Sequence, residues 1–268
     1  MKDKVLLFIP MYNCEKQIVR VLGQLKGEII NYISQVLIVN NRSTDKGEDA
    51  VVSCIDSGHS SLPIALVRND ENYGLGGSHK VAFQYAIEHD FDYVIVLHGD
   101  DQGNIEDFLP LLKSGEYEKH DCCLGARFMK GSKLPGYSKF RTFGNVVYNL
   151  MFSVATGRNI KDLGAGLNLY KIKMLKPLFF IQYPDNLTFN CYMLLANAYF
   201  KFDIKFIPIS WREDDQVSNV KLFSQAMTTI KIAVDYFFSR KQKFMTEDFR
   251  TKKIKAYTYT VIKEADHV

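Results

Sequence analysis

The sequence lacks the features that mark secreted, membrane-spanning and nucleic-acid-binding proteins. Its five cysteines are odd in number and include no Cys-x-x-Cys pair, which predicts reduced thiols in the core. No run of about 18 apolar residues occurs, so we expect no membrane-spanning helix. The 34 basic and 30 acidic side chains leave a net charge of only +4, so no nucleic-acid partner is expected.

We also expect no signal peptide, and we find no internal repeat and no interdomain linker in the sequence. The N-terminal apolar run is short, and Pro-Met-Tyr-Asn follows it in place of a small-residue cleavage site. We therefore expect a cytoplasmic protein. Because 47% of the 268 residues are hydrophobic, the chain can bury a full-sized core. We expect a main domain over residues 1–220, followed by an amphipathic helix and a polar tail over residues 221–268.

Short apolar runs, typical of buried strands, alternate with stretches of helical periodicity. In the first half the predicted strands are residues 4–10, 35–39, 64–67 and 93–97, and helices begin near residues 15, 45 and 78. In the second half we expect strands at residues 122–127, 166–170 and 204–209, and helices at residues 140–154, 188–199 and 221–240. This alternation predicts an α/β fold with a mostly parallel sheet and helices on both faces.

Polar clusters follow the first four predicted strands, at the point where each strand ends. They occupy residues 10–15, 40–45, 68–77 and 98–102. In parallel sheets, ligands bind beyond the carboxyl ends of the strands. The four clusters therefore predict a single binding site at that edge of the sheet.

The clusters contain four motifs in a fixed order. Pro-Met-Tyr-Asn-Cys-Glu begins at Pro10, Asn-Asn-Arg-Ser-Thr-Asp at Asn40, Asn-Tyr-Gly-Leu-Gly-Gly at Asn72, and His-Gly-Asp-Asp-Gln at His98. The series resembles the inverting glycosyltransferases of the GT-A fold, nearest the polyprenyl-phosphate (dolichyl-phosphate) mannosyl- and glucosyltransferase branch. The resemblance extends to Leu222. It implies a Rossmann-like GT-A fold and transfer of a hexose, with inversion, from a UDP- or GDP-sugar to polyprenyl phosphate.

The resemblance also implies how the nucleotide is bound. Pro10 and Tyr12 would pack against the base, and Glu15 would hydrogen-bond the base or the ribose. Glycines of the third motif would let backbone N–H groups approach the ligand. The residues implied for the nucleotide are Pro10, Tyr12, Asn13, Glu15, Asn40, Asn41, Ser43, Gly74, Gly76 and Asp100.

Two of these motifs allow a simpler interpretation as helix starts. Asn13 is a suitable N-cap, and so are residues 43–45. The second motif also departs from the resembling family, which usually carries two aspartates where this chain has Asn40 and Asn41. An amide presents a donor and an acceptor together, so base recognition remains plausible.

The fourth motif implies a divalent metal, Mn²⁺ or Mg²⁺. The family pattern Asp-x-Asp-x-Gln aligns with His98, Asp100 and Gln102, and these three residues are the predicted metal ligands. A neutral imidazole in place of a carboxylate is a softer ligand, which favours Mn²⁺ over Mg²⁺. An acidic pair after a strand is also typical of a solvated turn.

Later motifs imply the catalytic residues. Gly-Ala-Arg-Phe places Arg127 near a phosphate, and Asp-Leu-Gly-Ala-Gly places Asp162 at the acceptor side. Arg212 and Lys221 resemble a loop that closes over the donor diphosphate, where both would offset the charge of the leaving group.

The acceptor is predicted from what the helix at residues 188–199 contains. It carries no carboxylate to serve as a base for a sugar hydroxyl, although Asp185, Asp214 and Asp215 flank it or follow Arg212. A phosphate acceptor is already anionic and needs no base, which favours polyprenyl phosphate.

Two amphipathic stretches, residues 140–154 and 221–240, agree with a peripheral contact at the inner face of the membrane. Packing of the same stretches on the core is the alternative interpretation. Three other functions stay open: transfer to a saccharide hydroxyl in capsule or lipopolysaccharide synthesis, nucleotidyl transfer, and non-catalytic binding of a nucleotide sugar.

Overall fold

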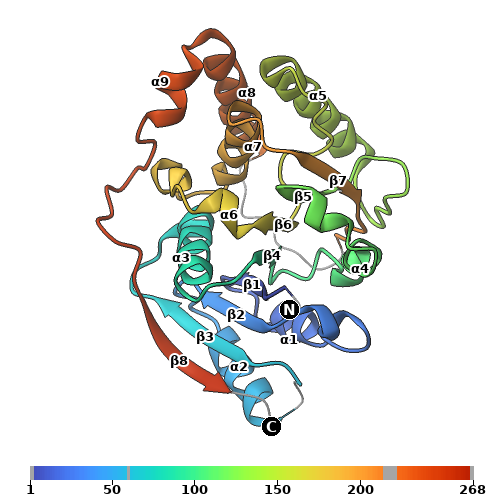
Figure 1. Ribbon diagram of the computed structural model, residues 1–268, viewed down its shortest axis with the longest axis vertical. Helices are drawn as coiled ribbons and strands as arrows, with labels where there is room; N and C mark the ends of the chain where they lie inside the picture. The colour runs from blue at the N-terminus through green and yellow to red at the C-terminus, as the bar shows by residue number, and fades with distance from the viewer. Residues whose placement is uncertain (1–2, 59–60, 214–221, 266–268) are drawn as a thin grey trace.

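The computed structural model describes residues 3–58, 61–213 and 222–265. Within these residues eight strands form one sheet in the order β7-β5-β6-β4-β1-β2-β3-β8 (Figure 1). The strands are β1 (Val5–Met11), β2 (Gln35–Asn40), β3 (Ile64–Asn69), β4 (Tyr93–Leu97), β5 (Cys122–Ala126), β6 (Leu167–Lys171), β7 (Ile204–Pro208) and β8 (Tyr259–Ala265). The first seven lie close to the strands predicted from the sequence.

Helices cover both faces of this sheet, as predicted. The α-helices are α1 (Glu15–Leu22), α2 (Gly47–Asp56), α3 (Gly74–Glu88), α4 (Leu109–Lys113), α5 (Lys139–Thr156), α6 (Ile172–Leu175), α7 (Phe189–Tyr199), α8 (Leu222–Phe238) and α9 (Lys241–Thr246). Short 3₁₀ turns are η1 (Ile29–Tyr32), η2 (Ile105–Phe108), η3 (Glu116–Lys119) and η4 (Phe179–Gln182). Alternate residues of β1 enter two separate cores: Leu6 packs on the face that α3 and α7 cover, and Leu7 on the face that α1 and α2 cover.

The central strands β1, β2, β3 and β4 are parallel, so their carboxyl ends meet at one edge. Strand β6 runs antiparallel to both of its neighbours, β4 and β5, which makes the sheet mixed. The predicted α/β fold with a mostly parallel sheet is confirmed. Its consequence is that the loops after β1, β2 and β4 lie side by side.

The C-terminal tail, which the sequence left unassigned, returns to the sheet. Strand β8 pairs antiparallel with β3, with Tyr259 opposite Asn69. The backbone carbonyl of Thr258 accepts from the Asp70 N–H at 3.2 Å, and Thr260 Oγ1 donates to Asp70 at 2.9 Å. The tail therefore forms one edge of the same sheet, while the division of the chain at residue 220 stays a prediction.

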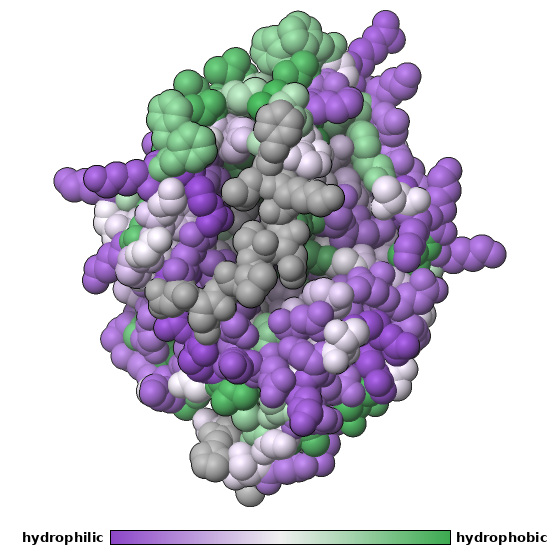
Figure 2. All heavy atoms as spheres, turned by 180° about the vertical axis from the view of Figure 1, so that it is seen from behind, coloured by the Kyte–Doolittle hydropathy of each residue, from purple (hydrophilic) through white to green (hydrophobic). Residues whose placement is uncertain are grey.

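Helices α5 and α8 contact each other and carry a group of exposed apolar side chains. Figure 2 shows hydrophobic side chains gathering at the end of the molecule that these helices form. The group, here called the α5–α8 surface, comprises Phe140, Phe143, Val146, Val147, Leu150, Val154, Met227, Val234, Phe237 and Phe238. None of the helices in the described part of the chain has the length and apolar content that crossing a bilayer requires.

Candidate active site

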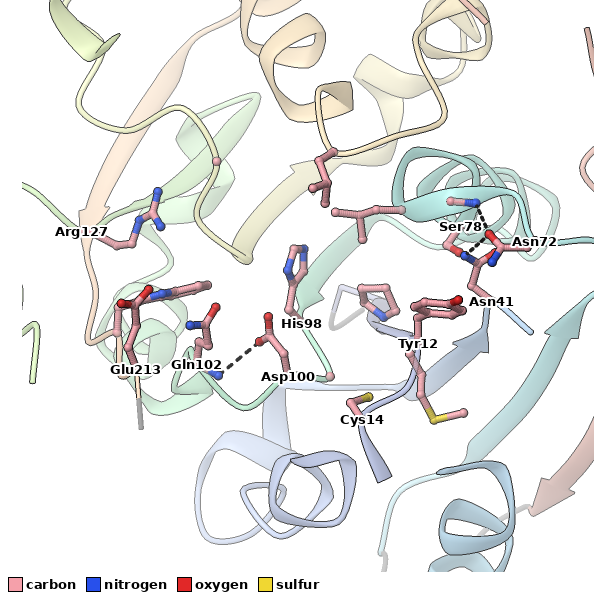
Figure 3. A pocket seen from close by; sticks show the side chains of 18 of the residues that line it. Tyr12, Cys14, Asn41, Asn72, Ser78, His98, Asp100, Gln102, Arg127 and Glu213 are labelled. Atoms are coloured by element: carbon pink, nitrogen blue, oxygen red, sulfur yellow. Dashed lines mark hydrogen bonds between the residues drawn. The ribbon is translucent and has the colours of Figure 1, made fainter. Parts of the chain in front are cut away.

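A cavity of about 650 Å³ opens at the carboxyl ends of β1, β2 and β4. Figure 3 shows how its labelled residues are arranged. Tyr12 and Asn41 lie at one end, Arg127 and Glu213 at the other, and Asp100 lies between them. Each of the four polar clusters contributes at least one residue to this cavity, whereas Asn40, Ser43 and Asp45 line a separate cavity of about 490 Å³.

The loop after β1 brings Tyr12 to the cavity. Tyr12 is 48% exposed, and Pro10 also lines the cavity. Asn13 has a left-handed backbone, with φ at 49°. Its N–H donates to Ser43 Oγ at 3.1 Å and its Oδ1 accepts from the Thr44 N–H at 2.7 Å. Asn13 and Ser43 therefore tie two loops together. Neither is a helix cap, since Cys14 and Lys46 hold the N-cap positions of α1 and α2.

Glu15 and Asn40 do not line this cavity and brace the same loops. The Glu15 N–H, in the first turn of α1, donates to Asp45 Oδ2 at 2.9 Å, and the Glu15 carboxylate accepts from the Lys46 N–H at 3.4 Å. Asn40 Oδ1 accepts from the Ser43 N–H at 2.8 Å, and its Nδ2 donates to Glu48 at 2.7 Å. Since these polar groups already have partners, the nucleotide contacts of Glu15 and Asn40 stay predictions.

Asn41 differs because it is both buried and part of the cavity wall. Its Oδ1 accepts from the Tyr73 N–H at 2.9 Å, and its Nδ2 donates to Asn72 Oδ1 at 2.9 Å. Asn72 Oδ1 also accepts from the Gly74 N–H at 3.0 Å. The second and third motifs are thereby joined through their amides.

The glycines of the third motif serve close packing. Gly74 has a φ of +73°, and a Cβ there would lie 2.4 Å from the Asp185 carbonyl oxygen. A Cβ on Gly76 would lie 2.4 Å from the Pro184 carbonyl oxygen. The Gly76 N–H donates to the Asp185 carbonyl at 2.7 Å. Gly74 lines the cavity, whereas the N–H of Gly76 is used by the chain itself.

The loop after β4 carries the three predicted metal ligands into the cavity wall. Asp100 Oδ1 accepts from the Gln102 N–H at 3.2 Å, and Gln102 Nε2 donates to the Arg212 carbonyl at 3.2 Å. His98 Nε2 is buried and has no hydrogen-bond partner among the residues that the structure describes. The same residues include no cluster of three or more His, Cys, Asp or Glu side chains suited to a metal.

The imidazole of His98 is held in its neutral form. Burial, and then the positive charge of Arg127, lower its pKa from 6.5 to about 4. The ring lies against Gly166, where a Cβ would come within 2.6 Å of His98 Cγ. A neutral imidazole keeps a lone pair on one of its nitrogens at neutral pH.

Asp101, whose role the sequence did not reveal, anchors two arginines. It is 4% exposed and has a left-handed backbone, with φ at 61°. Its carboxylate pairs with Arg20 of α1 and with Arg212, and Gln24 Nε2 donates to it at 2.9 Å. Arg212 therefore lies beside a neighbouring cavity of about 360 Å³ and does not line the main one. Its role at the donor diphosphate stays a prediction.

Two arginines lie at the far end of the cavity, each paired with a carboxylate. Arg127 donates to Asp162 through Nε and Nη2, both at 2.8 Å, so the two predicted catalytic residues hold each other. Arg141 of α5 donates to Glu213 at 2.6 Å. Arg127, Arg141 and Glu213 all line the cavity. Asp214, Asp215 and Lys221 lie outside the described residues.

Residues 7–179 match the family described as Glycosyl transferase family 2. The chain belongs to this family. A dolichyl-phosphate beta-glucosyltransferase of Trichomonas vaginalis is 20% identical over 243 residues, 85% of this chain and 70% of its own length. An undecaprenyl-phosphate 4-deoxy-4-formamido-L-arabinose transferase of Photorhabdus laumondii is 26% identical over 200 residues, 73% of this chain and 56% of its own length.

Solved structures agree on the fold. Glucosyl-3-phosphoglycerate synthase from Mycobacterium tuberculosis, in complex with Mn²⁺, UDP and phosphoglyceric acid, superposes with a TM-score of 0.63 at 10% identity. The match covers 88% of this chain and 79% of that one. S. aureus TarS 1–349 in complex with UDP-GlcNAc gives a TM-score of 0.55 at 16% identity, over 90% and 69% of the two chains. The predicted GT-A fold of this glycosyltransferase is confirmed.

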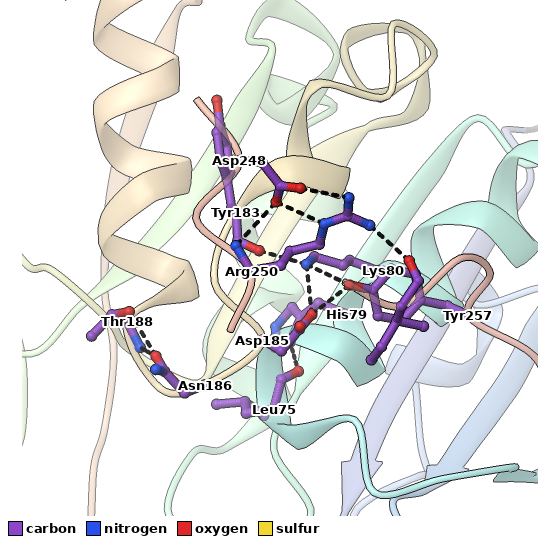
Figure 4. A network of polar contacts seen from close by, with 11 residues as sticks. Leu75, His79, Lys80, Tyr183, Asp185, Asn186, Thr188, Asp248, Arg250 and Tyr257 are labelled. Atoms are coloured by element: carbon purple, nitrogen blue, oxygen red, sulfur yellow. Dashed lines mark hydrogen bonds and ion pairs between the residues drawn. The ribbon is translucent and has the colours of Figure 1, made fainter. Parts of the chain in front are cut away.

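A buried polar network joins α3, the segment before α7 and the C-terminal tail (Figure 4). Lys80 is fully buried, and its Nζ lies 2.6 Å from Asp185 Oδ1 and 2.5 Å from the Tyr183 carbonyl. Tyr257, from the tail, donates to the same Asp185 oxygen at 2.7 Å. Asp185 does not line the cavity and is neutralised by Lys80, so it is poorly placed to act as the base that the sequence allowed.

Glu213 and Arg141 are cavity residues that the sequence analysis did not select. Glu213 begins an acidic run with the two aspartates that the sequence analysis named as possible bases. Arg141 was visible only as a basic residue at the start of an amphipathic helix. What places both in the site is the approach of α5 to the loop after β7, a long-range contact that sequence spacing does not reveal.

Proposed function

We propose that this glycosyltransferase transfers a hexose from a UDP- or GDP-sugar to polyprenyl phosphate with inversion of the anomeric carbon. The observation that carries the proposal is the order of aromatic and charged side chains along the cavity. An exposed aromatic ring lies at one end, a carboxylate at the centre and two arginines at the other end. This order matches a base, a diphosphate and an anionic acceptor.

At the donor end, Tyr12 would stack on the nucleobase, with Pro10 beside it. Base stacking on an aromatic ring is worth about 1–3 kcal/mol. The diphosphate would then reach the middle of the cavity, where Asp100 lies. Arg212, and Lys221 outside the described residues, would offset the charge of the departing nucleoside diphosphate.

A divalent metal, Mn²⁺ or Mg²⁺, fits the residues at the centre. Asp100 and Gln102 offer oxygen atoms at the cavity. Nε2 of the neutral His98, which has no partner in the part of the chain that the structure describes, is a further donor atom. Metals that act on nucleotides often take one or two protein carboxylates and complete their coordination with phosphate oxygens and water. A bound metal would supply positive charge for the leaving diphosphate.

At the acceptor end, Arg127 and Arg141 would bind the phosphate of the acceptor. Planar guanidinium groups suit a phosphate, and the carboxylates of Asp162 and Glu213 keep both of them in place. Asp162 would act as a positioning residue, because its side chain is 1% exposed and is engaged by Arg127. An acceptor phosphate is already nucleophilic, so the transfer would need no protein base.

The α5–α8 surface supports a lipid acceptor and a peripheral contact with the membrane. Phe140 and Phe143 are 84% and 68% exposed and flank Arg141, which lines the cavity. An apolar surface therefore begins where the anion-binding end of the cavity opens. Aromatic and aliphatic side chains of this kind insert into the interfacial region of a bilayer.

One observation favours a second candidate, transfer to a saccharide hydroxyl. Glu213 places a carboxylate at the acceptor end, where a hydroxyl would need a base. Its ion pair with Arg141 holds the carboxylate in that position.

The test is a transfer assay with purified full-length protein and Mn²⁺. Radiolabelled UDP- and GDP-hexoses are each incubated with a short-chain polyprenyl phosphate or with a panel of saccharides. We expect label to enter the organic phase as sugar-phosphate lipid. Label in the saccharide fraction alone would replace this proposal by the second candidate.

A further inference from the structure

Asn41 and Asn72, which both line the cavity, hold each other in one orientation. Asn41 Oδ1 accepts from the Tyr73 N–H and from Asn69 Nδ2, both at 2.9 Å. Asn72 Oδ1 accepts from the Gly74 N–H at 3.0 Å and from Asn41 Nδ2 at 2.9 Å. Because a backbone N–H can only donate, the two backbone groups fix which end of each amide is oxygen. Flipping either amide would set donor against donor.

This orientation leaves hydrogen-bond donors at the cavity. A carbonyl oxygen has two lone pairs, and both are used on Asn41 and on Asn72. Within the described residues, one N–H of Asn41 and both N–H bonds of Asn72 have no protein acceptor. Figure 3 shows the two amides together beside Tyr12. The wall therefore favours a ligand group that presents an acceptor.

We propose that Asn41 and Asn72 bind a carbonyl oxygen of the donor's nucleobase and thereby select keto bases over amino bases. The inference rests on the proposed function, in which the base stacks on Tyr12. Uracil and guanine carry a carbonyl oxygen, O4 or O6, where cytosine and adenine carry an amino group. An amino group at this wall would leave donors opposed and unpaired, a mismatch that hydrogen-bonding sites reject strongly.

The pairing of the two amides explains why position 41 cannot be considered alone. A carboxylate at Asn41 would keep the bonds from Asn69 and Tyr73 but would set an oxygen against Asn72 Oδ1. Changing Asn72 is the cleaner test. In Asn72→Asp one carboxylate oxygen still accepts from Gly74 and Asn41, while the other replaces the free NH₂ with an acceptor.

The experiment is calorimetric titration of UDP, CDP, GDP and ADP into the full-length protein with Mn²⁺. We expect UDP to bind at least tenfold more tightly than CDP, and GDP at least tenfold more tightly than ADP. Asn72→Asp should lower each ratio at least tenfold. Asn104→Asp adds the same charge at an exposed residue whose Oδ1 accepts from the Glu106 N–H, and it should leave both ratios unchanged.

The outcomes separate this inference from the function on which it rests. Equal affinity of the wild type for UDP and CDP would overturn base selection and leave the transferase proposal standing. An equal loss of UDP and CDP affinity in Asn72→Asp would also overturn it, because that pattern reports repulsion of the diphosphate only. No binding of any of the four nucleotides would overturn the proposed function and this inference with it.

Discussion

Arg127 and Asp162 form a two-pronged ion pair, in which Nε and Nη2 of the arginine lie 2.8 Å from Oδ2 and Oδ1 of the carboxylate. The backbone N–H of Arg127 donates to Asp162 Oδ2 as well, at 2.9 Å. Three bonds thus fix Arg127 just after β5, at the end of the cavity that lies opposite Tyr12. Removing Arg127 would leave the Asp162 carboxylate buried without its partner, which lowers the free energy of unfolding by about 3–5 kcal/mol.

Arg127→Lys keeps the charge and removes the two-pronged geometry. We expect the KM for polyprenyl phosphate to rise at least tenfold, with nucleotide affinity within twofold of the wild type. The free energy of unfolding should fall by about 2 kcal/mol, since hydrogen bonds to charged groups are lost. Steady-state kinetics and urea denaturation measure the two effects.

Arg250 offers a matched control for Arg127, because it forms the same two-pronged pair with Asp248 away from the cavity, again at 2.8 Å. Arg250→Lys should reduce stability and leave the acceptor KM unchanged. A similar rise in KM for both variants would mean that Arg127 acts through stability alone.

Asp100 is predicted to be the leading metal ligand. Asp100→Asn keeps an oxygen for the Gln102 N–H and removes the negative charge, so the local structure should persist. We expect the affinity for UDP or GDP to fall at least tenfold with Mn²⁺ present and to stay the same without metal. Calorimetry under both conditions checks this, and an unchanged affinity with Mn²⁺ would remove Asp100 from the site.

His98 occupies the position where the resembling family carries a carboxylate. His98→Asp adds a hard, anionic oxygen ligand, so the ratio of activity with Mg²⁺ to activity with Mn²⁺ should increase. Transfer rates measured across both metals give that ratio for the wild type and the variant. The same ratio in both proteins would place His98 outside the coordination sphere.

The strands and the position of the site could be predicted from the sequence because both depend on local patterns. Apolar runs such as Val5–Met11 are buried on both faces, and the polar residues directly after them must emerge at one edge. Strand β8 could not be predicted, because its Tyr-Thr-Val-Ile run is short and lies in a tail rich in charged residues. The run forms a strand because it pairs with the edge of β3, a contact that the local sequence does not indicate.

The partners of charged side chains could not be predicted, because they depend on contacts between distant segments. Asp101 pairs with Arg212, which lies 111 residues later in the sequence. Asp185, a candidate base by its position in the sequence, forms an ion pair with Lys80, which precedes it by 105 residues. Burial and pairing decided which carboxylates face the cavity, and neither quantity can be read from spacing.

The buried imidazole of His79 should make the stability of the protein depend on pH. Burial, and then the neighbouring His98, lower the pKa of His79 from 6.5 to about 3. Between these values the unfolded chain binds a proton that the folded protein does not, so stability rises with pH through this window. The free energy of unfolding should fall as pH drops below about 6.5, by about 1.4 kcal/mol per pH unit for one group.

Replacing His79 with Gln should reduce the slope by about 1.4 kcal/mol per pH unit, because Gln does not titrate, while His98, whose pKa is also lowered, keeps its own contribution. His89 is a suitable control, since it lies just beyond the end of α3, is exposed and contacts the Tyr85 carbonyl at 2.9 Å, as His79 contacts the Leu75 carbonyl. Urea denaturation of His79→Gln and His89→Gln from pH 4 to pH 8 gives the slope of the free energy of unfolding against pH for each variant. Equal slopes for His79→Gln and the wild type would contradict the assignment.

The α5–α8 surface predicts binding to anionic membranes. Phe140 and Phe143 are exposed and lie on the helix that carries Arg141 into the cavity. Replacing both with Glu places like charge against anionic lipids and removes the apolar contact. We expect the wild type, and not the double variant, to float with phosphatidylglycerol-containing vesicles. Val19→Glu, at an exposed residue of α1, is the control and should float like the wild type.

The double variant should retain nucleotide affinity and lose transfer to vesicle-embedded polyprenyl phosphate, while transfer to a detergent-dispersed short-chain acceptor persists. Loss of both transfers together would show that the two phenylalanines shape the active site itself, and flotation of the double variant would place membrane contact elsewhere.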